Sequence, residues 1–341
     1  MDMTERKQKI LSAVVENYVR TGEPVGSKAL LGELDFSVSS ATIRNDMADL
    51  ASMGYLEQPH TSAGRVPTNL GYRYYIDNLM RRVELDEDEG RQIAKSVSSG
   101  RGDTEQLLEK AGEVLARLTN CAAITTMPKG ERATVRRAEI VPIGPRTAMI
   151  ILLTSSGTLK SKACRSDMPI TAQTVERFYN ICAESFINKP LESISTAMLQ
   201  TMVASMGEYA LEMSSFCVTL ADLANDALHT DVLLEGQANL FHHRELTDDI
   251  IELMEFLRRG DPVAKLVNTD KKSVEVKIGT ENEYRQLKNS SVIVSHYDVK
   301  GNRSGALGII GPTRLDYGRL IAYMRFVAGI VGNVLSETMD G

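Results

Sequence analysis

Side chains that can form paired hydrogen bonds are concentrated between Ser39 and Thr68 of this 341-residue chain. Arg44 can donate two hydrogen bonds to O6 and N7 of guanine, and Asn45 can bond N6 and N7 of adenine in the same bidentate way. Each such contact discriminates against a wrong base by about 1–3 kcal/mol. These two residue types at adjacent positions favour DNA as the partner of this segment.

A helix is predicted to carry both side chains, because apolar residues recur at steps of four and three. Ile43, Met47 and Leu50 form one helical face. Ser39 or Ser40 can cap the start of the helix, and a glycine at position 54 can end it. The opposite face holds short or hydrogen-bonding side chains that allow close approach to a groove, namely Ser40, Ala41, Arg44, Asn45, Ala48 and Ser52.

A hairpin is predicted directly after this helix, with strands at 55–58 and 65–66 and a turn at 59–64. A helix followed by a hairpin is typical of the recognition helix and wing of a winged helix-turn-helix, whose helix enters the major groove. Hydroxyl and cationic side chains on the wing suit phosphate or the minor groove. The alternative is an ordinary surface helix and hairpin with polar side chains. The predicted DNA-binding residues are Ser39, Ser40, Thr42, Arg44, Asn45, His60, Thr61, Ser62 and Arg65.

Three further helices are expected to support this segment. They cover residues 4–20, residues 28–34 with Ser27 as cap, and a stretch from Thr68 to about residue 82. The tyrosines of the last helix have the spacing of core residues. Within residues 1–82, ten Lys or Arg face ten Asp or Glu. DNA binding therefore requires that the folded domain gathers its basic groups on one face.

The rest of the chain reads as strands, then a helical block, then strands again. A helix at 104–119 follows a Ser- and Gly-rich break, and strands are expected at 122–127, 135–143, 147–154 and 158–164. Helices are expected at 171–186, 194–206, 209–228 and 247–257. Strands at 273–279, 291–296 and 305–311 and a closing helix at 317–336 complete the chain. This order predicts an α+β, multidomain protein whose sheet domain is interrupted by an insertion.

Several classes of function are disfavoured by composition and pattern. The net charge of -6 argues against a chain that is basic throughout. The four cysteines form no CxxC pair, so we expect neither a metal site nor a disulfide framework. The metalloprotease, nucleophile-elbow, dinucleotide and P-loop patterns do not occur, so we expect no enzyme and no cofactor. We found no export signal and no apolar run of about 20 residues. We therefore expect a cytoplasmic protein without a membrane span.

Two long segments resemble HrcA, the bacterial heat-inducible transcription repressor family. The first joins TERKQKILSAVVENYVRTGEPVGSKAL, residues 39–68 and GYRYYIDNL, and the second is GALGIIGPTRLDYGRLI at 305–321. The family pattern usually has Met where Leu315 stands here. The resemblance implies a winged-helix domain at 1–82, a helical linker at 83–119 and a GAF-like domain made of 120–167 and 269–341. It also implies a mainly helical inserted dimerising domain at 168–268.

The resemblance implies a function as well. A homodimer would bind the CIRCE inverted-repeat operator of chaperonin and chaperone operons as a repressor. The GroEL chaperonin would promote its active form, and methionine-rich helices between residues 197 and 213 would suit a soft contact surface. Two alternatives remain: a regulator gated by a small molecule in the GAF-like domain, and an enzyme built on the sheet domain. A ligand that shifts melting and DNA affinity together would favour the first, and a cluster of perturbed titratable groups would favour the second.

Overall fold

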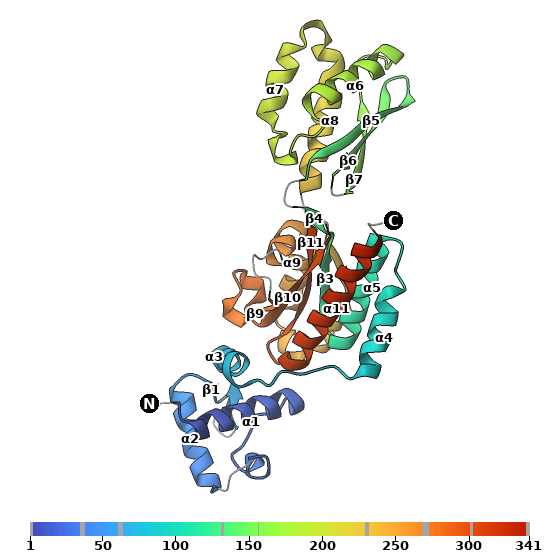
Figure 1. The fold of residues 1–341 in the computed structure, drawn as a ribbon. Helices are drawn as coiled ribbons and strands as arrows, with labels where there is room; N and C mark the ends of the chain where they lie inside the picture. Colours follow the sequence, from blue (N-terminus) through green and yellow to red (C-terminus); the bar gives the residue numbers. More distant parts are fainter. Residues whose placement is uncertain are drawn as a thin grey trace. The chain divides into compact units, whose positions relative to one another are not determined.

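The chain is an α+β protein of two compact units (Figure 1). The computed structural model describes residues 3–34, 38–60, 64–130, 133–155, 157–228, 232–267, 273–300 and 303–338. The first unit combines Met1–Thr125, Val232–Tyr297 and Ala306–Gly341, and the second combines Thr126–Asp231 with Asp298–Gly305. The second unit is therefore an insertion into the first, as the order of elements predicted.

The N-terminal part of the first unit is helical with one small hairpin. It consists of α1 (Glu5–Thr21), a 3-10 helix (Ala29–Gly32), α2 (Ser40–Ser52), β1 (Leu56–Glu57), β2 (Val66–Pro67) and α3 (Asn69–Tyr74), which continues as a π-helical turn (Tyr75–Leu79). The side chains of Thr4, Ser39 and Thr68 each accept a backbone N–H at the start of a helix. Two expectations were wrong: the second helix is a short 3-10 helix without a Ser27 cap, and the last helix ends at Leu79.

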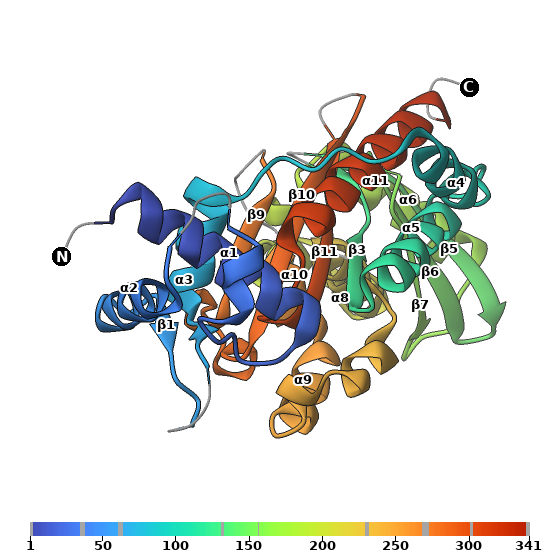
Figure 2. The ribbon, with the colours of Figure 1, turned by 90° about the horizontal axis from the view of Figure 1, so that it is seen from below.

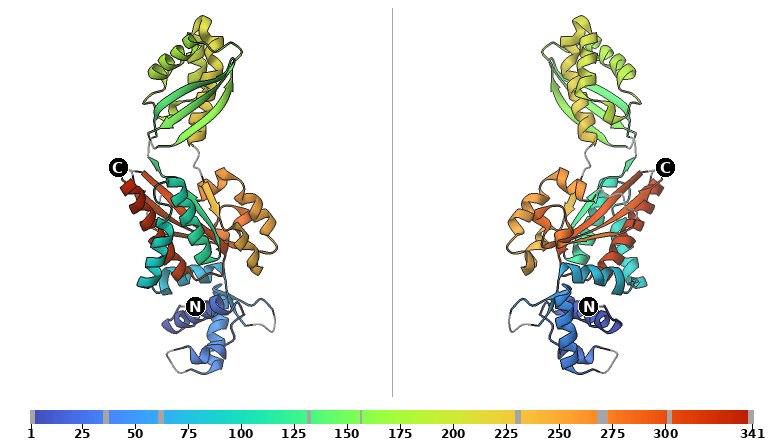
Figure 3. Two further views of the ribbon diagram at one scale, coloured as in Figure 1. Left: turned by 90° about the vertical axis from the view of Figure 1, so that its right-hand side faces the viewer. Right: turned by 90° about the vertical axis from the view of Figure 1, so that its left-hand side faces the viewer.

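The first unit has a sheet with the strand order β8-β3-β11-β10-β9, in which β3 pairs with β11 and β9 pairs with β10 in antiparallel fashion. The strands are β3 (Ala122–Thr126), β8 (Val232–Glu235), β9 (Glu275–Ile278), β10 (Ser290–Val299) and β11 (Arg303–Pro312). The helices α4 (Glu87–Ser98), α5 (Thr104–Thr119) and α11 (Tyr317–Thr338) pack together on one face (Figures 2 and 3). On the other face, α9 (Ile250–Leu257) and α10 (Gly260–Val267) bury Leu253, Phe256 and Val263 against the strands.

α11 is the one helix among the described residues that is long and apolar enough to cross a membrane, by length and composition only. In this structure Leu320, Met324, Val327 and Val331 are buried. This burial is the pattern of a core helix that lies on a sheet.

The second unit is a three-stranded antiparallel sheet with helices on one face. Its strands are β5 (Val135–Gly144), β6 (Thr147–Thr154) and β7 (Leu159–Arg165), and a two-residue strand, β4 (Lys129–Gly130), pairs with the start of β11. Alternate residues of β6 (Ala148, Ile150 and Leu152) are buried in one cluster with Phe178 and Phe216. Those two side chains come from α6 (Ala172–Ser185) and α8 (Ala210–Leu228), and α7 (Thr196–Ser205) lies between them in sequence.

This arrangement differs from the predicted boundary at residue 168. Strands β5 to β7 were assigned to the sheet of the first unit, but they form a sheet of their own and pack on α8. The insertion therefore begins near Thr126 and contains a sheet as well as helices. Antiparallel strands joined by short turns pair locally, so their alternating pattern does not reveal which sheet they enter. Helix α4 lies in the segment predicted as a helical linker, whereas helix α10 and strand β8 were not predicted.

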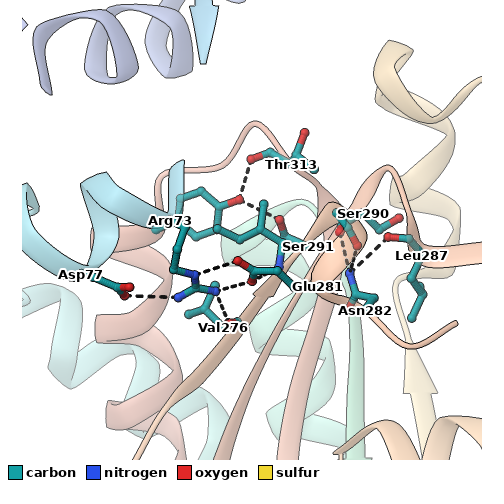
Figure 4. Close-up of polar contacts among 12 residues, drawn as sticks. Arg73, Asp77, Val276, Glu281, Asn282, Leu287, Ser290, Ser291 and Thr313 are labelled. Carbon is teal, nitrogen blue, oxygen red and sulfur yellow. Dashed lines mark hydrogen bonds and ion pairs between the residues drawn. The ribbon is translucent and has the colours of Figure 1, made fainter. Parts of the chain in front are cut away.

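The loop between β9 and β10 is held by one buried amide. Nδ2 of Asn282 lies 2.9 Å from the carbonyl oxygen of Gly279, 3.2 Å from that of Leu287 and 3.0 Å from that of Ser290 (Figure 4). Asn282 is 8% exposed, so water does not replace these bonds readily. The amide thus fixes the loop that also carries Glu281.

We expect Asn282→Ala to lower the free energy of unfolding by about 2–3 kcal/mol, because carbonyl oxygens lose their donor. Asn282→Asp should cost more at pH 7.5 than at pH 4.5. Burial among carbonyl oxygens raises the pKa of the introduced carboxyl above its unfolded value of about 3.9, so the extra loss grows as pH rises. Urea unfolding at both pH values measures this, with exposed Asn78→Ala as control. Equal effects of all three substitutions would contradict the role of Asn282.

Candidate nucleic-acid interface

Helix α2 buries one face and exposes the other, as its sequence predicted. Ile43, Met47 and Leu50 are at most 4% exposed. Arg44 and Asn45 lie on the exposed face, where Ala41, Ala48 and Ser52 are exposed too. The side chains of Arg44 and Asn45 have no hydrogen bond or ion pair with any residue that the structure describes. Their donors are therefore available to an external partner.

The start of α2 is fixed by a side-chain cap. Oγ of Ser39 accepts the backbone N–H of Thr42 at 3.1 Å, and the two hydroxyl oxygens lie 2.9 Å apart. Ser40, the first residue of the helix, is half-buried. The hydroxyls of Ser39 and Thr42 thus stabilise the helix start and leave the next turn, with Arg44 and Asn45, in a defined orientation.

The acidic side chains of α2 are neutralised by α1. Nε and Nη2 of Arg6 donate to the two carboxylate oxygens of Asp46 at 2.7 and 3.0 Å, and Nζ of Lys7 lies 2.8 Å from a carboxylate oxygen of Asp49. Asp46 is only 4% exposed. A carboxylate on a helix that meets phosphates would repel them, and these pairs remove that repulsion. The two carboxylates of α2 are therefore paired and do not repel a phosphate from Arg44.

The base of the hairpin is anchored to the segment after α1. Val25 and Arg65 exchange two backbone hydrogen bonds, each 2.9 Å long. A Cβ atom at Gly64 would lie 2.4 Å from the carbonyl oxygen of Val25, so only glycine allows this close approach. The hairpin therefore leaves the helices in a fixed direction.

Of the four residues predicted on the hairpin, two lie within the described residues. His60 is exposed. Arg65 is half-buried, and its Nε is buried without a hydrogen-bond partner among the residues described here. Thr61 and Ser62 lie outside the described residues.

No local sequence pattern indicates two features of this region. Arg6 and Lys7 are polar residues of α1 whose pairing with α2 was not predicted. Arg6 and Asp46 are directly paired but lie 40 positions apart in the sequence. Arg314, near the C-terminus, donates through Nη1 to the carbonyl oxygen of Val19 at 3.1 Å. Contacts at such separations depend on the tertiary fold and have no local pattern.

An exposed helix face with neutralised acids, next to an anchored hairpin, is a candidate surface for nucleic acid. The comparisons assign the chain more narrowly. The family model of the HrcA protein C-terminal domain matches residues 105–321. The chain belongs to the HrcA family.

Curated relatives match over nearly the whole chain. A protein of Carboxydothermus hydrogenoformans is 33% identical over 335 residues, covering 98% of both chains, and one of Brevibacillus brevis is 31% identical over 343 residues, covering 99% of both. Both are named heat-inducible transcription repressor HrcA. A crystal structure described as a hypothetical protein is 24% identical, covers 99% of this chain and all of its own, and has a TM-score of 0.63, so it shares the fold.

We expect Arg6→Ala to lower the Tm more than Arg20→Ala. Arg6→Ala leaves the buried carboxylate of Asp46 without its partner. Arg20 instead pairs with Glu33 at 2.6 Å, where both side chains are at least 34% exposed. The double variant Arg6→Ala/Asp46→Ala should recover part of the loss, because both charges are removed together. Calorimetry measures the Tm of the wild type and of these three variants, and a double variant that is no more stable than Arg6→Ala would contradict the pairing.

Proposed function

We propose that this chain is a sequence-specific DNA-binding transcription repressor of heat-shock operons. The observation that carries the proposal is the exposure of Arg44 and Asn45, whose side chains have no partner among the described residues, on a helix whose own acids are neutralised. The names of the full-length relatives support the role of a heat-inducible repressor. Those names describe repressors and do not favour an enzyme.

The N-terminal part of the first unit is, in this proposal, a winged helix-turn-helix. Its recognition helix is α2, which follows α1 and the 3-10 helix, and its wing is the β1–β2 hairpin. Arg44 and Asn45 contact base edges in the major groove. Ser39, Ser40 and Thr42 at the start of α2, and the wing residues His60, Thr61, Ser62 and Arg65, contact phosphates or the minor groove.

The remaining domains serve dimerisation and regulation in this proposal. The sheet of the first unit with its helices is the GAF-like domain, and the second unit is the dimerising insertion. Apolar side chains exposed on the second unit support association there: Ile143 is 58% exposed, Leu159 64% and Leu211 80%. A two-fold dimer presents two copies of α2 and therefore reads an inverted repeat, which the family resemblance identifies as CIRCE.

The proposed regulatory partner is the GroEL chaperonin, which promotes the active repressor until unfolded proteins occupy it. A regulator gated by a small molecule is the second candidate. The observation in its favour is a cavity of about 820 Å³ lined by Val83, Leu85, Ala322 and Phe326 with charged residues around them. This volume suits a drug-sized ligand.

Fluorescence anisotropy tests the repressor proposal. Labelled duplexes carry the CIRCE inverted repeat, a single half-site or a scrambled sequence, and binding is measured over a salt series. The inverted repeat should bind at least about 10³-fold more tightly than the scrambled duplex, and the half-site should lie between them. Addition of chaperonin should strengthen operator binding. Equal binding to all three duplexes would refute the proposal, whereas selective binding that ignores chaperonin would favour a small-molecule effector.

Arg44→Ala should weaken operator binding by about 5- to 150-fold, which corresponds to about 1–3 kcal/mol. The loss should concentrate at one base position of each half-site, because a bidentate arginine reads one base. Arg117→Ala is the matched control, since it removes an equally exposed arginine from α5. Anisotropy with operators substituted at single positions measures both variants. A loss that is uniform across sequences would place Arg44 on phosphate instead.

A further inference from the structure

Arg73 joins helix α3 to the loop after strand β9, within the first unit. Its Nε donates to one carboxylate oxygen of Glu281 at 2.9 Å, and its Nη2 lies 2.5 Å from the other (Figure 4). The same Nη2 donates to the carbonyl oxygen of Val276 at 2.5 Å. A planar guanidinium whose Nε and Nη2 both bind one carboxylate is fixed in angle as well as in distance.

Glu281 is itself held in place for this contact. Its Oε2 accepts the backbone N–H of Ile278 at 2.9 Å, and Asn282 closes the loop around it. Partial burial raises the pKa of the Glu281 carboxyl, but the hydrogen bonds from Arg73 and Ile278 lower it further, so the net shift is downward. The carboxylate is therefore charged and positioned throughout the neutral range.

Arg314 makes a second connection, to the end of helix α1. Its Nη1 donates to the carbonyl oxygen of Val19 in the last turn of α1, and its Nε donates to Glu245 at 2.5 Å. Between the two arginines, the rings of Tyr72 and Tyr317 lie 5.7 Å apart. The hydroxyl of Tyr317 donates to the carbonyl oxygen of Thr313 at 2.6 Å. The same hydroxyl lies 2.7 Å from the hydroxyl of Ser291. Two helices of the N-terminal part thus meet the sheet and its loops at separate points.

We propose that Arg73 and Arg314 form an orientation latch, which sets the direction in which helix α2 is presented from the sheet of the first unit. The proposal rests on the DNA-binding function given above. Three contact points, from the end of α1 and from both Arg73 and Tyr72 of α3, are enough to fix one rigid body on another. The covalent connection between the two parts is the chain from Met80 to Asp86, which has no regular structure.

The latch has a measurable consequence for operator geometry. B-DNA has about 10–10.5 base pairs per turn, so one added base pair rotates a half-site by roughly 34–36° and moves it by about 3.4 Å. A dimer with latched domains fits one spacing of half-sites. A dimer with loose domains accepts several spacings, but loses affinity because it must order the domains on binding.

The experiment uses the full chain and the double variant Glu281→Gln/Arg314→Gln. Asp77→Asn is the matched control, because Asp77 pairs with Arg73 at 3.3 Å along the same helix and has no hydrogen bond or ion pair with the loop among the described residues. The first readout is hydrogen exchange of the hydrogen-bonded amides of α3. The second is anisotropy with inverted repeats whose half-site spacing is changed by one or two base pairs in either direction. Arg73→Lys keeps the positive charge but cannot bind both carboxylate oxygens of Glu281 through two nitrogens. It gives a second test if the double variant folds poorly.

The latch predicts exchange of the hydrogen-bonded amides of α3 that is about fivefold or more faster in the double variant and unchanged in Asp77→Asn. Wild type should prefer one spacing by about tenfold or more, and the double variant by about threefold or less. If the double variant keeps both the slow exchange and the sharp spacing preference, the latch is refuted and the repressor proposal stands. If wild type does not distinguish an inverted repeat from a scrambled duplex, the repressor proposal fails, and unchanged exchange then refutes the latch separately.

Discussion

The pairing of α1 with α2 is the interaction on which the candidate interface depends. Burying a carboxylate such as Asp46 is costly unless a cation and hydrogen bonds accompany it. Arg6 supplies both through its two nitrogens, and Lys7, itself only 7% exposed, does the same for Asp49. Together with the buried apolar face of α2, these pairs set the rotation of α2 about its axis against α1. Arg44 and Asn45 then lie on the exposed face. The same contacts serve packing, helix orientation and surface charge.

Features determined by local chemistry were predictable from the sequence. The helix at 104–119 and the strand at 147–154 have the bounds that the pattern predicted, and Ser39 and Thr68 cap helices as expected. An N-terminal cap needs only a side-chain hydroxyl and the backbone N–H of the residue three positions later. Both can be recognised in the sequence. Ser27 had the right residue type but no regular α-helix behind it, because the following segment closes as a 3-10 helix of four residues.

Features that depend on distant pairing were not predictable. The alternating pattern of β5 to β7 shows that one face is buried, but the covering elements are α6 and α8, which come later in the chain. The contact of Arg73 with Glu281 spans 208 positions. The candidate DNA-contacting residues were accessible to sequence reasoning because they lie on one helix and one hairpin. The charges that neutralise or orient that helix come from α1 and from the C-terminal half of the first unit.

The magnitudes of the two sets of contacts determine which can yield to the other. Arg73 and Glu281 are 26% and 33% exposed at their side chains, so solvent screens the pair. Ion pairs of this exposure contribute about 0–1 kcal/mol each. In the proposed complex, each bidentate base contact would discriminate against a wrong base by about 1–3 kcal/mol, and a dimer would make several of them. Base contacts of this size would exceed the contribution of the Arg73–Glu281 pair alone, and non-specific DNA would lack them. An orientation held by weak and partly exposed pairs can thus be stable in the free protein and still respond to the right sequence.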